Sequence, residues 1–348
     1  MNRRRWYRVT NVTVALAVVA TLIMLPYLLE ASPGTITIRP GAVGDETNLT
    51  PYPNTGEANW EDVDEATSDD DEAYVEGGGG AYVTDLYALG DTTVSGKGKI
   101  NSVTVYINCR GTAEGVGART RIKTNAVAYD GTEITLTISY ATYSTAYTTN
   151  PQTTNEWTWA EINALQAGVG LKKPTGGATS RCTQVWVVVD YTPATLESYK
   201  EVAHTTVWGT VADPYDTGTQ TAYIYGPNFI ASHGYTVGYY DNDGTKVASE
   251  SVISGADNTL SSQYLLTTDP NAIAGTWHAV AFDNDLGSPP NTYAECPGAV
   301  GYMVEDSFEV NQGAIPEFPT AMAGITVAGL CFGIYYWMRK RRLAYVKA

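Results

Sequence analysis

Eight acidic side chains crowd into residues 60–72, which makes this stretch the densest source of metal-ligating oxygen in the chain. Carboxylate oxygens are the hard ligands that Ca²⁺ requires, and six to eight of them complete its shell. The Asp-x-Asp-x-Asp-Gly order of an EF-hand loop is missing, so a calcium site and a solvated acidic loop are both open interpretations. The candidate ligands are Asp62, Asp64, Asp69, Asp70, Asp71 and Glu72.

Two tryptophans stand at the start of the clearest helix signal. Thr158 and Glu161 have the spacing of a capping box, which predicts a short helix from residue 158 to about residue 166. Trp157 and Trp159 flank its first residue. Exposed, they would form a platform on which a sugar or a protein stacks; buried, they would fasten the helix to a sheet.

Cys109 and Cys182 each fall within a strongly strand-like run. A disulfide between them is permitted outside the cell, and two buried free thiols are the alternative, because sequence alone does not place the two Cα atoms. Asn48 begins an Asn-Leu-Thr sequon on a predicted exposed loop, which makes it a candidate glycosylation site.

Hydrolytic chemistry has little support in the sequence. None of the three histidines stands beside a nucleophile motif, and neither Gly-x-Ser-x-Gly nor His-Glu-x-x-His occurs. A glycosidase needs only two well-placed carboxylates, so glycan hydrolysis stays an alternative. The sequence favours a protein that is not an enzyme.

The elements that must position these residues are strands. Alternating runs rich in β-branched residues and tyrosine predict an all-β body. Residues 33–193 are expected to form a jelly-roll-like β-sandwich, with strands at 35–39, 100–109, 119–129, 132–139 and 183–191. Residues 197–311 are expected to form an immunoglobulin-like sandwich, with a turn at 241–244 and strands at 221–225, 235–240, 246–252, 277–282 and 307–310.

Both ends of the chain have membrane signals. Residues 1–31 place four arginines before a long apolar run, as in a signal peptide or a signal anchor. Residues 321–338 contain no charge and are just long enough to span a bilayer as a helix. A basic stop follows it, made of Arg339, Lys340, Arg341 and Arg342. The positive charges predict that both termini are cytoplasmic before processing and that the body lies outside the cell.

Residues 315–342 contain Pro316, Glu317, Phe318 and Pro319, then the apolar helix and then the basic stop. In this order they resemble the PEF-CTERM tail, a sorting region of prokaryotic, mainly archaeal, surface proteins. The resemblance implies a partner, an archaeosortase- or exosortase-like membrane protease that removes the helix. Residues 60–191 resemble an uncharacterised β-domain of surface proteins, on the basis of Trp60, Tyr74-Val75, Asn150-Pro151, Trp157-Thr-Trp159 and Thr183-Gln-Val185. No activity comes with that second resemblance.

Charge limits the range of partners. Residues 31–320 contain 36 of the 37 acids and only 12 of the 21 Lys and Arg residues, a net charge of −24. Such a body repels nucleic acid and anionic surfaces. The sequence therefore predicts a membrane-anchored structural or adhesive surface protein, with glycans or other surface proteins as partners; a carbohydrate-binding or glycan-hydrolysing protein is the alternative.

Overall fold

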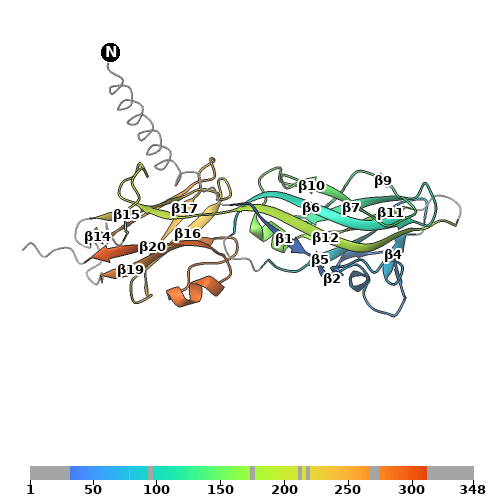
Figure 1. Ribbon diagram of the computed structural model, residues 1–348, viewed down its shortest axis with the longest axis horizontal. Helices are drawn as coiled ribbons and strands as arrows, with labels where there is room; N and C mark the ends of the chain where they lie inside the picture. Colours follow the sequence, from blue (N-terminus) through green and yellow to red (C-terminus); the bar gives the residue numbers. More distant parts are fainter. Residues whose placement is uncertain are drawn as a thin grey trace, which may run out of the picture.

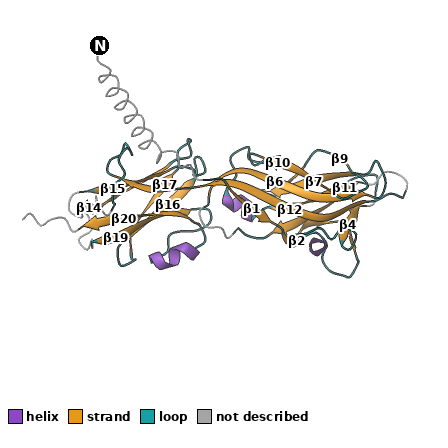
Figure 2. Ribbon diagram, viewed as in Figure 1, coloured by secondary structure: helices purple, strands orange, loops and turns teal. Residues whose placement is uncertain are grey.

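The computed structural model describes residues 32–77, 79–92, 97–172, 177–210, 214–216, 220–266 and 274–311. Two β-rich lobes lie end to end along the long axis, and the chain enters the second lobe soon after β12 (Ser180–Pro193) (Figure 1). Strands dominate both lobes, and the helices are short (Figure 2). The prediction of an all-β body is confirmed. Within the described ranges, no helix is both long enough and apolar enough to cross a membrane.

The first lobe is a sandwich of two antiparallel sheets. Sheet A has the order β3-β4-β12-β6-β10, and β1 pairs with the far part of β12. Its other strands are β1 (Gly34–Ile38), β3 (Thr50–Tyr52), β4 (Tyr74–Gly77), β6 (Gly98–Gly111) and β10 (Ala141–Tyr147). Buried valines and isoleucines of β6 and β12 alternate with more exposed residues, so one face of sheet A lies on the core.

Sheet B covers the other side of this core, in the order β2-β5-β11-β7-β8, with β9 beside β7. Its strands are β2 (Pro40–Thr47), β5 (Val83–Leu89), β7 (Gly117–Thr124), β8 (Val127–Asp130), β9 (Ile134–Thr135) and β11 (Gln166–Lys172). From β4 to β12 the chain passes repeatedly between the two sheets. The orders β4-β12-β6-β10 and β5-β11-β7-β8 are those of an eight-stranded jelly-roll.

Several predicted strand boundaries in this lobe are wrong. The run at 119–129 is not one strand but the hairpin β7–β8, because Asn125 and Ala126 turn the chain with φ angles of 48° and 65°. The strand predicted at 132–139 shrinks to the two residues of β9. The capping box is confirmed: Thr158 accepts from the backbone N–H of Glu161, and helix α2 (Trp159–Asn163) follows, shorter than predicted.

The second lobe is also a two-sheet sandwich. Sheet C has the order β13-β15-β18, and sheet D has the order β14-β20-β19-β16-β17. The elements are β13 (Glu197–Tyr199), β14 (Tyr215–Asp216), β15 (Thr221–Gly226), β16 (Gly234–Tyr240), β17 (Lys246–Ile253), β18 (Leu260–Leu265), β19 (Gly275–Asp283) and β20 (Tyr302–Asn311). All five strands predicted here are present. Asp241 also closes the predicted turn, by accepting from the backbone N–H of Thr245.

Candidate functional site

The outward side of sheet A carries a patch of uncharged side chains. Cross-strand pairing brings three residues from each of β10, β6 and β12 into one three-by-three block. We call this block the neutral face; it consists of Thr142, Ser144, Ala146, Thr104, Tyr106, Asn108, Gln184, Trp186 and Val188. The β10 residues are exposed, since their strand is the last of the sheet. None of these nine residues is charged, on a body with a net charge of −24.

An aromatic pair occupies the centre of the neutral face. The rings of Tyr106 and Trp186 stack with centroids 5.1 Å apart and planes 5° from parallel. The guanidinium of Arg39 lies 5.7 Å from the Trp186 ring centroid, so Trp186 has a cation–π partner as well. On the β10 side, Tyr106 is paired only with the short Ser144. The Tyr106 side chain is half-buried.

Two buried amides lie beside the rings and are held in position. Asn108 donates from Nδ2 to Oε1 of Gln184 at 3.3 Å, and Gln184 donates from Nε2 to the backbone oxygen of Glu65 at 2.8 Å. Arg39 donates to the same Glu65 oxygen. Planar rings next to fixed amide donors and acceptors are the groups with which proteins bind sugar hydroxyls and ring faces. This combination is the candidate functional site.

The acid-rich residues 60–72, which we call the acidic segment, border the neutral face. The backbone of this segment fills the gap along β12 between β1 and β4, where Val185 donates to the oxygen of Val63 at 2.9 Å. Thr183 donates to Asp69 at 2.6 Å. Arg110 donates from Nη2 to both carboxylate oxygens of Asp71 at 2.7 and 2.8 Å, and Arg181 donates to Oδ1 of Asp71 at 3.1 Å. The segment is thus fastened to sheet A, which the sequence did not reveal.

Two carboxyls of this segment have unusual proton affinity. Burial raises the pKa of Glu65 to about 7, and the neighbouring Asp69 and Asp64 add to the effect. Burial also raises the pKa of Asp62 to about 6, with repulsion from Glu57 and Asp69 as a further cause. For Asp71, burial favours the neutral form, but the hydrogen bonds from Arg110 and Arg181 outweigh it and lower the pKa.

The six predicted calcium ligands are spread along the segment rather than gathered. Asp62 is buried, Asp69 and Asp71 are engaged by sheet A, and Asp70 and Glu72 are exposed. Among the described residues, the one group of three His, Cys, Asp or Glu side chains with ligand atoms within 4.8 Å of one another lies elsewhere. Binding of Ca²⁺ to the acidic segment stays a prediction.

The interpretation of Trp157 and Trp159 as a ligand platform is wrong. Both side chains are fully buried, so neither ring has a face for a ligand. Trp157 donates from Nε1 to the backbone oxygen of Tyr147 at 3.1 Å, and Trp159 donates to that of Gly98 at 2.8 Å. They fasten the start of α2 to β10 and β6, the alternative that the sequence also allowed.

The other predicted site residues lie apart from the neutral face. Cys109 is directly opposite Cys182 in the β6–β12 pair, and both are buried free thiols. Burial raises the pKa of Cys109 well above its usual value. Asn48 is exposed between β2 and β3, and its side-chain amide donates to the backbone oxygen of Thr84 at 3.0 Å. The signal region at 1–31, Pro316, Glu317, Phe318, Pro319, the helix at 321–338 and the basic stop at 339–342 lie outside the described residues.

No protein-family model and no curated protein matches this chain. Among solved structures, it is similar to an immunoglobulin-like protein from Pseudomonas aeruginosa, with 14% identity, 34% of this chain and 92% of that chain covered, and a TM-score of 0.22. It is also similar to a CBM4 structure, with 17% identity, 42% and 99% covered, and a TM-score of 0.25. A third is the N-terminal cellulose-binding domain of a Cellulomonas fimi β-1,4-glucanase, with 15% identity, 43% and 92% covered, and a TM-score of 0.21. At such TM-scores the functional argument rests on the residues of this chain.

Proposed function

We propose that this protein is a non-enzymatic adhesive protein of the cell surface that binds uncharged saccharide chains on the neutral face of its jelly-roll. The observation that carries the proposal is the stacked, half-buried Tyr106–Trp186 pair on the neutral face, beside the buried amides of Asn108 and Gln184. Aromatic rings contribute apolar contact with a sugar ring at little entropic cost.

Electrostatics narrows the ligand class. A surrounding body with a net charge of −24 repels uronic acids, sulfated glycans and nucleic acids. Arg110 and Arg181 do not offset this locally, because both are paired with the carboxylate of Asp71. Arg39 donates to a backbone oxygen and leaves one positive charge beside Trp186. Neutral hexose polymers are therefore the class that fits best.

Replacing Trp186 with alanine is expected to weaken binding of neutral polysaccharides by about tenfold, roughly 1.4 kcal/mol, because the aromatic stack is lost. Binding of the full-length protein would be measured by affinity electrophoresis and on glycan arrays. Tyr52→Ala is the matched control, since Tyr52 is an exposed aromatic residue stacked at the opposite end of sheet A. Equal binding by Trp186→Ala and the parent, or no binding to any neutral glycan, would refute the proposal.

We also propose that the protein is anchored outside the cell and that its tail is processed at Pro316–Pro319 by a membrane protease. The support is the order of the Pro-Glu-Phe-Pro core, the uncharged run and the four basic residues. The intact mass of the protein from its native cells is expected to lack residues 321–348. Recovery of the complete C-terminus in the membrane fraction would instead mean a plain transmembrane anchor.

A further inference from the structure

A second group of polar side chains lies at the junction of the two lobes. The lobes are joined by direct contacts: Asn228 donates to the oxygen of Pro193 at 3.2 Å, and the backbone N–H of Ala231 donates to Glu156 at 3.0 Å. A cavity of about 380 Å³ is lined by Asn155, Glu156 and Thr158 of the first lobe and by residues 230–233 of the second. His233 lines this cavity.

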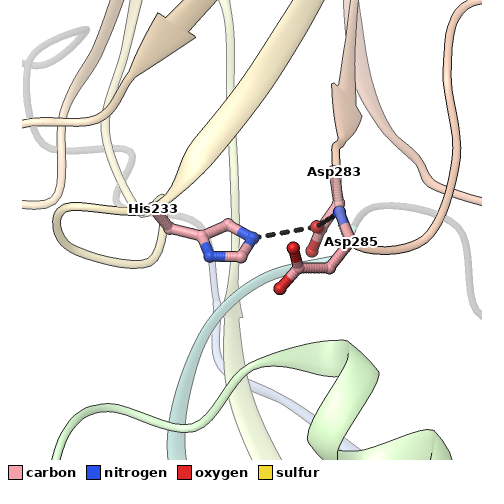
Figure 3. A group of neighbouring side chains, drawn as sticks. All are labelled: His233, Asp283 and Asp285. Carbon is pink, nitrogen blue, oxygen red and sulfur yellow. Dashed lines mark hydrogen bonds and ion pairs between the residues drawn. The ribbon is translucent and has the colours of Figure 1, made fainter.

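Three side chains converge behind the cavity wall. His233 precedes β16, Asp283 ends β19, and Asp285 is in the turn that follows. Because β16 and β19 are paired, the three residues meet at one end of sheet D (Figure 3). Nε2 of His233 is 2.8 Å from Oδ1 of Asp283, and ligand atoms of all three residues lie within 4.8 Å of one another.

The imidazole is positioned before any ligand arrives. The backbone N–H of His233 donates to Oγ of Ser254 at 3.0 Å. The imidazole ring packs edge-on against the ring of Tyr235, with centroids 5.0 Å apart. Asp285 is exposed, so one side of the group is open to water. Fixed protein ligands together with an open position are features of a site that binds a cation from solution.

Asp283 provides an independent observation that points to a ligand. Its side chain is fully buried. Oδ1 accepts from His233 and from the backbone N–H of Asp285 at 3.0 Å, but no described residue donates to Oδ2. A buried carboxylate oxygen without a partner costs free energy, more so beside the second carboxylate of Asp285. A bound cation would satisfy Oδ2 and neutralise both carboxylates, and the proton between His233 and Asp283 would be released to solvent if Nε2 became the ligand.

We propose that His233, Asp283 and Asp285 bind a divalent first-row transition-metal ion, with Zn²⁺ as the best fit. One imidazole nitrogen and two carboxylate oxygens are a ligand set that suits Zn²⁺ or Mn²⁺. Ca²⁺ fits less well, because it takes six to eight oxygen ligands and makes little use of imidazole. The site is therefore chemically distinct from the calcium site predicted for the acidic segment. A metal ion in this site would lie beside the cavity between the two lobes, which His233 lines.

The test is titration of EDTA-treated full-length protein with ZnCl₂, followed by calorimetry and by thermal unfolding. One ion per chain and a higher unfolding temperature are expected. Asp285→Ala, at an exposed position, and His233→Ala are each expected to weaken binding by about tenfold or more. His204→Ala is the matched control, because His204 stacks on Tyr225 in sheet C. Unchanged affinity in Asp285→Ala, no binding at millimolar Zn²⁺, or displacement of Zn²⁺ by equimolar Ca²⁺ would overturn the proposal.

Discussion

Replacing Asp85 with alanine is expected to lower the free energy of unfolding of the jelly-roll lobe by about 4 kcal/mol. Asp85 is fully buried on β5, and its carboxylate accepts four hydrogen bonds. The backbone N–H groups of Asn48 and Leu49 donate to Oδ1 at 2.5 and 2.8 Å, while Asn59 and Tyr87 donate to Oδ2 at 2.6 and 3.2 Å. Alanine would leave all four donors without their acceptor and leave a cavity.

Urea unfolding, followed by tryptophan fluorescence, would measure this loss in the full-length protein. Asp85→Asn keeps the shape but cannot accept at both positions, so an intermediate loss is expected. Glu114→Ala is the matched control, because Glu114 lies exposed between β6 and β7, and a change within about 0.5 kcal/mol is expected there. A loss below about 1 kcal/mol for Asp85→Ala would mean that the four donors find other partners.

Asp85 also illustrates what the sequence could not reveal about the fold. β6 and β12 alternate cleanly between apolar and other side chains, so the all-β class and these strands could be predicted from period alone. In β5 the acidic residue stands at an inward position and interrupts that pattern. Two of its four donors, the backbone N–H groups of Asn48 and Leu49, lie 37 and 36 residues earlier in the chain, so the strand becomes recognisable only in the folded state.

The candidate site was similarly hidden. Tyr106 and Trp186 are separated by 80 positions, and they stack only because β6 and β12 pair in one particular register. A local signal did exist. Tyr106 and Trp186 stand at outward positions of alternating strands, where small polar residues are more usual than large aromatic ones. The sequence instead predicted a platform at Trp157 and Trp159, because their spacing beside a helix cap is visible in sequence whereas their burial is not.

Acidity is expected to stabilise the protein: its free energy of unfolding should be higher at about pH 5 than at about pH 7.5. The pKa of Glu65 rises from 4.5 to about 7, mainly through burial, and that of Asp306 in the second lobe rises from 3.8 to about 6 for the same reason. A folded-state pKa above the unfolded value means that the folded state binds protons more tightly. Stability is therefore lost as pH rises from about 4 to 7 and stays low above that range.

Acids with lowered pKa values set the lower end of the pH range in which the protein is most stable. The pKa of Glu156 is lowered: burial alone would raise it, but hydrogen bonds from the Ala231 N–H and from Lys99 outweigh burial. Hydrogen bonds from arginines lower the pKa of Asp71 in the same way. Their contribution is present above about pH 4 and disappears as pH falls through their lowered pKa values, so maximum stability is expected at about pH 5.

Glu65→Gln isolates the largest of these effects. Oε2 of Glu65 is buried and accepts no hydrogen bond from the described residues, so an uncharged amide removes the cost of ionisation. The variant is expected to be about 2 kcal/mol more stable than the parent at pH 7.5 and no more stable at about pH 5. Glu114→Gln, at an exposed position, should follow the parent at both pH values. Thermal and urea unfolding across this range would measure the difference.

A parent protein that is equally stable at both pH values, or most stable above pH 7, would contradict the burial of Glu65 and Asp306 as the controlling feature.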